Sequence, residues 1–182
     1  MFRRILLLLA IPFAAVIAFS TAASASVGPG TFTPTADSFN SANAPGSSHL
    51  TSGTPQCTVA SNLNVTCSQF VLGGVGHTNA DVALSASYSA TIDCFNPGTN
   101  PNNPIESHTT SFSATSEAMV TSTKNGQLSV PQQSVSPFSV AQGCPNTNWT
   151  PQIRPGTLTL NNFTYTLTFA GFTSPYITIT SS

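Results

Sequence analysis

The sequence predicts an all-β domain, a sandwich of two antiparallel sheets that is stapled by disulfides. Three observations lead to this fold class: one long stretch of alternating residues, an even number of cysteines, and no segment with helical periodicity. From Val82 to Cys94, apolar side chains occupy the even positions and polar ones occupy all odd positions except Ala83. Successive side chains of a strand point to opposite faces, so this stretch is predicted to be a long half-buried strand with Cys94 on its core face.

The N-terminus has the pattern of a secretory signal peptide. Met1–Arg4 is short and basic, residues 5–19 are apolar, and Ala23-Ser24-Ala25 is a site of small residues at which cleavage is expected after Ala25. The apolar run is about 15 residues long, short of the roughly 20 that span a bilayer. We therefore expect a secreted, extracellular protein with no membrane anchor after cleavage.

The mature chain is long enough for one domain and carries few charges. Removing 25 of 182 residues leaves 157, enough to bury a core. Two of the four basic residues, Arg3 and Arg4, leave with the signal, so two remain against five acids and the net charge becomes −3. No basic patch is available for nucleic acid or an anionic membrane.

The cysteines are Cys57, Cys67, Cys94 and Cys144, all in the mature chain. An even number in an exported protein predicts two disulfides, for which three connectivities are possible. A hairpin turning about Asn62 places Cys57 opposite Cys67, with Cα atoms about 4.5–5.5 Å apart, a spacing that a disulfide bridges. We therefore prefer Cys57–Cys67, which leaves Cys94–Cys144 as the second bridge. No cysteine spacing typical of zinc sites occurs.

The chain is predicted to have three parts: the signal peptide of residues 1–25, a leader of residues 26–53, and the sandwich of residues 54–182. The leader is rich in Ser, Thr, Ala, Pro and Gly, so we expect it to be flexible, with one edge strand near Thr31–Thr35. A change of phase between Cys67 and Phe70 predicts a bulge near Ser68-Gln69.

After the long strand, the next is predicted from Glu106 to about Thr123. The three residues Lys124-Asn125-Gly126 are predicted to close a hairpin with a glycine bulge, because this turn places Val120 opposite Val130 and brings the apolar faces together. Pro131–Pro155 contains five prolines and is predicted to be irregular.

The C-terminal part is also predicted to consist of strands. Apolar residues change phase at Asn161-Asn162, between Leu158 and Phe169, which indicates either a tight turn or a bulge. The last strand is predicted at Tyr176–Thr180. Seven to nine short strands in all favour an immunoglobulin-like architecture, although the Cys–Trp–Cys arrangement of true immunoglobulin domains is not evident.

Several short motifs resemble a group of small secreted bacterial proteins of unknown function. They are Cys57-Thr58-Val59 with Asn64-Val65-Thr66-Cys67, Gly76-His77-Thr78-Asn79-Ala80, Lys124-Asn125-Gly126, Cys144-Pro145-Asn146, and Phe163-Thr164-Tyr165-Thr166-Leu167 through Thr180. The resemblance covers most of Thr54–Thr180. It implies a bacterial, extracytoplasmic protein and implies no activity, since the group offers no catalytic residues to transfer.

Residues suited to catalysis are sparse, so we expect neither an enzyme nor a cofactor or metal site. The histidines are His49, His77 and His108, and no Gly-x-Ser-x-Gly nucleophile motif is present. Asp81 and Asp93 share one face of the predicted strand, but 12 residues of strand separate them by about 40 Å, too far for a glycosidase pair. His77 with Asp81, or His108 with Glu106, are the residue pairs from which a metal site is most easily imagined.

The single tryptophan, Trp149, lies in a polar segment beside Asn146 and Asn148, and these three are the candidate ligand-binding residues. The leading hypothesis is a secreted, non-enzymatic module with a structural, adhesive or protein-interaction role. Its partner is expected to be an extracellular protein or a cell-envelope polymer. The alternatives are a carbohydrate- or envelope-polymer-binding module, with sugar stacked on Trp149, and a secreted protease inhibitor.

Overall fold

In the computed structural model, residues 26–98, 103–137 and 143–181 are described. The predicted signal peptide and its cleavage site after Ala25 lie outside these residues. The described part is all-β, as predicted, and includes one short 3₁₀ turn, η1 (Ser41–Asn43). The strands are β1 (Gly30–Phe32), β2 (His49–Gly53), β3 (Cys57–Val59), β4 (Val65–Cys67), β5 (Phe70–Gly73), β6 (Ala80–Phe95), β7 (Glu106–Val120), β8 (Leu128–Val130), β9 (Gln133–Val135), β10 (Thr150–Ile153), β11 (Thr159–Phe169) and β12 (Ile177–Thr180).

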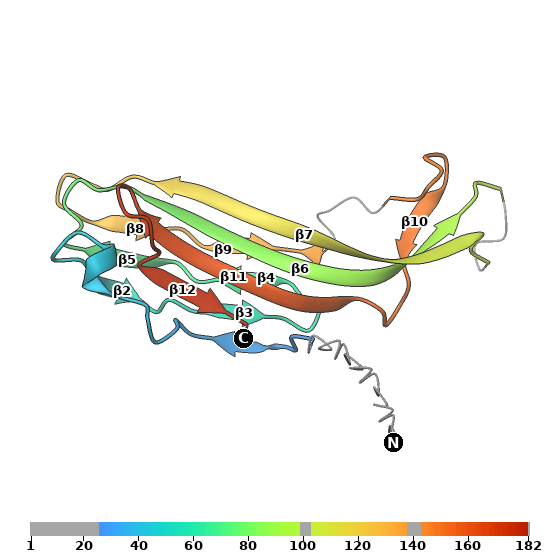
Figure 1. Cartoon of the computed structure of the whole chain (residues 1–182), viewed down its shortest axis with the longest axis horizontal. Helices are drawn as coiled ribbons and strands as arrows, with labels where there is room; N and C mark the ends of the chain where they lie inside the picture. Colours follow the sequence, from blue (N-terminus) through green and yellow to red (C-terminus); the bar gives the residue numbers. More distant parts are fainter. Residues whose placement is uncertain (1–25, 99–102, 138–142, 182) are drawn as a thin grey trace, which may run out of the picture.

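One layer of the sandwich is a five-stranded antiparallel sheet built around β6 (Figure 1). On one side β6 pairs with β7 over its whole length, from Ala80↔Val120 to Cys94↔Glu106. On the other side it pairs first with β11 and then, towards its C-terminal end, with β10. β12 pairs with the outer side of β11. β7 and β12 are therefore the two long-side edges of this sheet.

The other layer consists of two smaller antiparallel sheets, β1-β3-β4-β9 and β2-β5-β8, which lie end to end behind the five-stranded sheet (Figure 1). The chain passes from one to the other between β4 and β5, at the predicted irregularity. There the Ser68 hydroxyl donates to the Thr54 carbonyl (2.5 Å) and accepts from the Gln56 amide (3.1 Å). These bonds satisfy the backbone where the ladder is interrupted.

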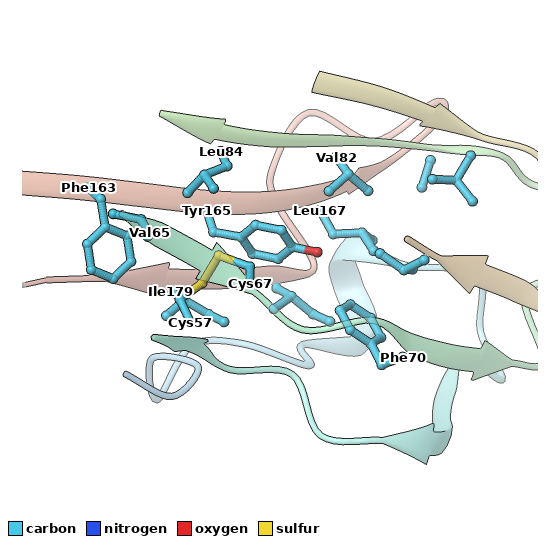
Figure 2. Packing of buried hydrophobic residues seen from close by; sticks show 14 of the residues in the cluster. Cys57, Val65, Cys67, Phe70, Val82, Leu84, Phe163, Tyr165, Leu167 and Ile179 are labelled. Carbon is cyan, nitrogen blue, oxygen red and sulfur yellow. A yellow bond between two sulfur atoms is a disulfide. The ribbon is translucent and has the colours of Figure 1, made fainter. Parts of the chain in front are cut away.

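The core fills the space between the layers, and β6 supplies its central row. The even residues of β6 are buried and the odd residues are half-buried or exposed, which confirms the predicted alternation. Figure 2 shows Leu84 of β6 and Tyr165 of β11 facing the Cys57–Cys67 bridge of the opposite layer. Apolar burial of this extent is the main stabilising contribution to such a fold.

Both predicted disulfides are present. Cys57–Cys67 joins directly paired residues of β3 and β4, with Cα atoms 3.9 Å apart, and both cysteines are buried. Cys94–Cys144 joins the end of β6 to the segment before β10, with Cα atoms 5.9 Å apart. Neither bridge connects the two layers, in contrast to the inter-sheet disulfide of immunoglobulin domains.

The paired strands begin at Gly30 rather than at Thr54. In the segment predicted to be a leader, β1 pairs with β3 at the edge of its sheet, close to the predicted edge strand, and β2 pairs with β5. The Phe32 ring packs edge-on against Phe163, with centroids 5.1 Å apart. Composition alone suggested a linker because strands of three to five exposed residues leave no apolar alternation to detect.

The predicted pairing of Val120 with Val130 is wrong. Val120 pairs with Ala80 in the five-stranded sheet, whereas Val130 pairs with Phe70 in the other layer. The three-residue turn itself does form, with Gly126 at φ 70° and its amide donating to the Thr123 carbonyl. The turn thus carries the chain from one layer to the other, and both valines point into the core from opposite sides.

Pro131–Pro155 was predicted to be irregular, yet it contains β9 and β10. Both are three or four residues long, too short for their periodicity to show in the sequence. At Asn161-Asn162 the bulge alternative is confirmed: β11 is one strand whose register with β6 shifts between Leu160 and Asn162.

The sheet extends past the second layer as an arm (Figure 1). The arm is formed by the residue pairs of β6 and β7 that lie beyond Tyr88, together with β10. The Tyr88 hydroxyl donates to the Leu63 carbonyl at the β3–β4 turn (3.1 Å), which marks where the second layer ends. The arm has its own small cluster, in which Ala90, Ile92 and Cys94 are buried.

Candidate functional site

The three candidate ligand-binding residues lie in the segment that leads into β10. Asn146 shapes this segment: its side-chain oxygen accepts from the Asn148 amide, and its carbonyl accepts from the Trp149 amide, both at 3.0 Å. Asn148 is exposed. The Trp149 ring is half-buried and packs on the arm cluster beside Ile92 and Cys94. The indole therefore contributes to packing in the arm.

The tyrosines offer no ring surface to a ligand, because Tyr88, Tyr165 and Tyr176 are all buried. The Tyr176 hydroxyl donates to the Ser48 carbonyl (3.1 Å), and the buried Tyr165 hydroxyl has no partner among the described residues. Burial raises the pKa of Tyr88 to about 12 and raises the pKa values of Tyr165 and Tyr176 above the ordinary value. No aromatic platform of Trp149 with tyrosines is formed.

The histidines lie on separate elements. His49 is on β2, where its Nδ1 lies 2.8 Å from the Ser47 carbonyl oxygen, His77 is in the turn before β6, and His108 is on β7. Within residues 26–98, 103–137 and 143–181, no three His, Cys, Asp or Glu side chains gather as metal ligands do. Neither pair weighed from the sequence, His77 with Asp81 or His108 with Glu106, gains a third ligand within those ranges.

One charged cluster was not predicted from the sequence, and it lies on the outer face of the arm. Arg154 donates from Nε and Nη2 to the Asp93 carboxylate (3.1 and 2.7 Å) and from Nη2 to the Ser107 hydroxyl (2.8 Å). Hydrogen bonds from Arg154 and Ser107 hold the pKa of Asp93 below its ordinary value. The cluster ties β10, β6 and β7 together, and both charges are already paired with each other.

Two of the surface hollows lined by described residues are candidate sites. The first, of about 470 Å³, lies over β2, β5 and β8 and includes Ser52, Val71 and Ser129. The second, of about 300 Å³, lies where the small side chain of Ala83 faces Glu117 across β6 and β7. Neither combines an acid, a base and a nucleophile, so neither is arranged for acid–base or covalent catalysis.

Among the described residues, β7 has backbone groups on its outer side that no neighbouring strand pairs with. The amide and carbonyl of Thr91 point away from β7: the amide donates to the Thr157 hydroxyl (3.0 Å) and the carbonyl accepts from the Arg154 amide (2.8 Å). Residues of an antiparallel pair alternate between hydrogen-bonded and non-bonded positions, and Thr91 pairs with Thr109. The odd residues of β7 therefore direct their amides and carbonyls to its free side.

This free edge of β7 is long and uninterrupted. The strand has 15 residues, and its ladder with β6 runs without a register shift. It contains no proline, lysine or arginine, and its carboxylates, Glu106 and Glu117, lie towards its two ends. In the described part of the chain, no backbone group pairs with the odd residues of β7 from outside. Such an edge is a template for pairing with another chain.

The opposite edge of the same sheet is covered by the chain itself. Thr178 of β12 accepts from the Thr35 amide (2.9 Å), and its own amide donates to the Ser38 hydroxyl (3.0 Å). The Phe39 amide donates to the Tyr176 carbonyl (2.7 Å), and the two rings are in edge-on contact. The segment Thr35–Phe39 thus satisfies the outward amide and carbonyl of Thr178 and the carbonyl of Tyr176.

The remaining edges are short or broken. β1 has three residues, and β8 and β9 have three each with Pro131 between them. β2 has five residues and a register shift between Leu50 and Ser52, while β10 has four residues and includes Pro151. Short edge strands, bulges and prolines all discourage pairing with another chain. Among the described strands, β7 alone is left both long and open.

Comparison with known proteins gave no relatives: no family model, no curated protein and no solved structure matches this chain. Over the described residues, no helix has the length and apolar character required to cross a bilayer.

Proposed function

We propose that this protein is a secreted, non-catalytic interaction module of a bacterial cell surface or its surroundings, and that it binds its partner by strand addition at β7. The two disulfides support an oxidising, extracellular setting. The N-terminal pattern ending at Ala25 supports export. The function itself rests on one observation: the described residues cover or interrupt the other edges and leave the 15-residue strand β7 without a strand partner on its outer side.

Strand addition suits the chemistry of this protein. The affinity comes from backbone hydrogen bonds to the odd residues of β7, so no cluster of charged or aromatic side chains is needed. Net charge −3 and the near absence of basic residues make electrostatic capture a minor contribution. A carbohydrate-binding function would depend on Trp149 alone, and that ring is half-buried in the arm.

The test is to compare Ser113→Pro with Ser113→Ala. Ser113 is an odd residue of β7, so proline removes one outward amide without removing a hydrogen bond to β6. Both variants are used as bait for the extracytoplasmic fraction of the source bacterium with a short cross-linker. We expect the alanine variant to capture the partner and the proline variant to lose it. Equal capture by both, with both folded by near-UV circular dichroism, would contradict strand addition at β7.

A further inference from the structure

We infer that the partner at the β7 edge is a second copy of this chain, paired antiparallel about a two-fold axis at Phe112. This inference rests on the proposed function and names the partner of the same edge. A two-fold interface uses the same surface on both copies, and an edge strand that pairs with itself meets this condition. The two five-stranded sheets then form one sheet that runs through both copies.

The face pattern of β7 permits this pairing. Directly opposed residues of antiparallel strands point to the same face, so odd must meet odd and even must meet even. A centre at Phe112 places Ser111 opposite Ser113 of the second copy and Thr109 opposite its Thr115. All four are exposed on the outer face, and their backbone groups point to the free side of β7. Over the strand this gives about 12 new backbone hydrogen bonds.

The charges of β7 also favour the antiparallel arrangement. With the axis at Phe112, Glu117 lies opposite Ser107 of the second copy, and Glu106 lies opposite its Ala118, so no two carboxylates face each other. A parallel in-register pairing would instead place each glutamate beside the same glutamate, which is destabilising. The ten residues between the two glutamates carry no acid and no lysine or arginine.

The half-buried ring of Phe112 explains why we place the two-fold axis of the dimer at this residue. In one chain its ring stacks on Tyr88, with centroids 5.7 Å apart and an interplanar angle of 22°, but it remains half-buried at the edge of the core. At the axis the two Phe112 residues form a non-hydrogen-bonded pair, the closer of the two antiparallel pairings. Each ring then covers the open side of the other, and the apolar core becomes continuous between the copies.

The assembly closes at two copies. Self-pairing uses the β7 edge of each chain, and the opposite edge of the sheet is covered by Thr35–Phe39. No second long edge remains among the described strands from which a third copy could extend the sheet. A dimer rather than a fibre is therefore expected.

The test uses the mature protein with both disulfides intact. Sedimentation velocity over a concentration series should show a monomer–dimer equilibrium for the wild type and for Ser113→Ala, and only monomer for Ser113→Pro. The register is tested by mixing Ser111→Cys with Ser113→Cys under mild oxidation, which should give a cross-linked heterodimer. Ser107→Cys is the matched control: two copies of position 107 lie about 33 Å apart in this pairing, so no cross-link is expected.

Each outcome separates the two proposals. Monomer at every concentration, together with capture of a different protein by Ser113→Ala but not by Ser113→Pro, overturns the second copy as partner and leaves strand addition standing. A dimer that persists in Ser113→Pro, or that cross-links through Ser107→Cys, places the interface elsewhere and overturns the inference. Monomer together with equal capture by both Ser113 variants overturns both proposals.

Discussion

The two long edges of the five-stranded sheet differ: among the described residues, β12 is covered by another segment of the chain and β7 is not. At β12, the backbone groups of Thr178 and the carbonyl of Tyr176 are bonded by the segment Thr35–Phe39. At β7, a strand almost four times as long has no such cover among the described residues. An exposed edge invites unwanted pairing with other chains. Because the described residues cover one edge of the sheet and leave the longer one open, we propose a partner for the open edge.

The largest effect on stability is expected from removing the segment that covers β12. A variant that lacks residues 26–40 loses β1, the contact of Phe32 with Phe163 and the contact of Phe39 with Tyr176. Partial burial of the Phe32 ring, of the Phe39 ring (39% exposed) and of their segment stabilises by about 4 kcal/mol, so the free energy of unfolding in urea should fall by about this amount. The variant should also form species larger than a dimer, because both edges are then open. Unchanged stability would show that the segment does not cover β12 in solution.

Alkaline pH is expected to have the next largest effect, a loss of stability of the core of the five-stranded sheet. Burial raises the pKa of Tyr88 to about 12 and also raises the pKa values of Tyr165 on β11 and of Tyr176 beside β12. The unfolded chain releases its tyrosine protons from about pH 10, so stability is intact below that pH and falls as the pH rises towards 12, with Tyr88 alone contributing about 2 kcal/mol to the loss. Denaturant unfolding followed by far-UV circular dichroism measures this slope. Tyr176→Phe, which cannot ionise, should have a shallower slope than the wild type.

A matched pair of serine substitutions compares the two edges directly. The Ser38 hydroxyl donates to the Thr178 carbonyl (3.0 Å) and accepts from the Thr178 amide, whereas the Ser113 hydroxyl points to the solvent from the outer face of β7. Ser38→Ala should lower the free energy of unfolding by about 1 kcal/mol, because it leaves the Thr178 amide without a partner. Ser113→Ala should change it by less than about 0.5 kcal/mol. Equal effects would remove the distinction between the edges.

The smallest effect is expected from the charge of the open edge. Glu117→Gln removes one exposed carboxylate from β7 of a chain whose net charge becomes −3 once the predicted signal peptide is removed. Two copies then repel each other less, so the dimer dissociation constant should fall by a factor of about two at low salt and remain unchanged at high salt. Sedimentation at two ionic strengths measures this difference. Weaker dimerisation of Glu117→Gln at low salt would contradict the proposed arrangement of charges.

Much of the fold was predictable because the alternation of apolar and polar residues shows which side chains of a strand face the core. The burial of the even residues of β6, the pairing of Cys57 with Cys67 and the phase change at Asn161-Asn162 all follow from the two-residue period of a strand. The alternation does not show which strand pairs with which. Val120 and Val130 have matching parity whether their strands pair with each other or face each other across the core, and the structure has the second arrangement.

The open edge was not predictable from the sequence. Glu106–Val120 alternates in the way that any half-buried strand does, and neither its position at the edge nor the cover on β12 leaves a local pattern. The absence of proline and lysine from this strand was visible, but it acquires meaning only once β7 is known to lie at an edge. Trp149 was singled out for its rarity, and its position in the arm depends on the Cys94–Cys144 bridge and β10, contacts distant in sequence.

Residue-resolved amide exchange across a dilution series tests the central claim most directly. In the dilute protein, the even amides of β7 are bonded to β6 and should exchange slowly, while the odd amides, including Ser111 and Ser113, should exchange quickly. As the concentration rises, the odd amides should become protected together, with Ser111 and Ser113 nearest the axis protected most. Fast exchange of the odd amides at every concentration would contradict self-pairing at β7, and slow exchange even in the dilute monomer would show that this edge is not open.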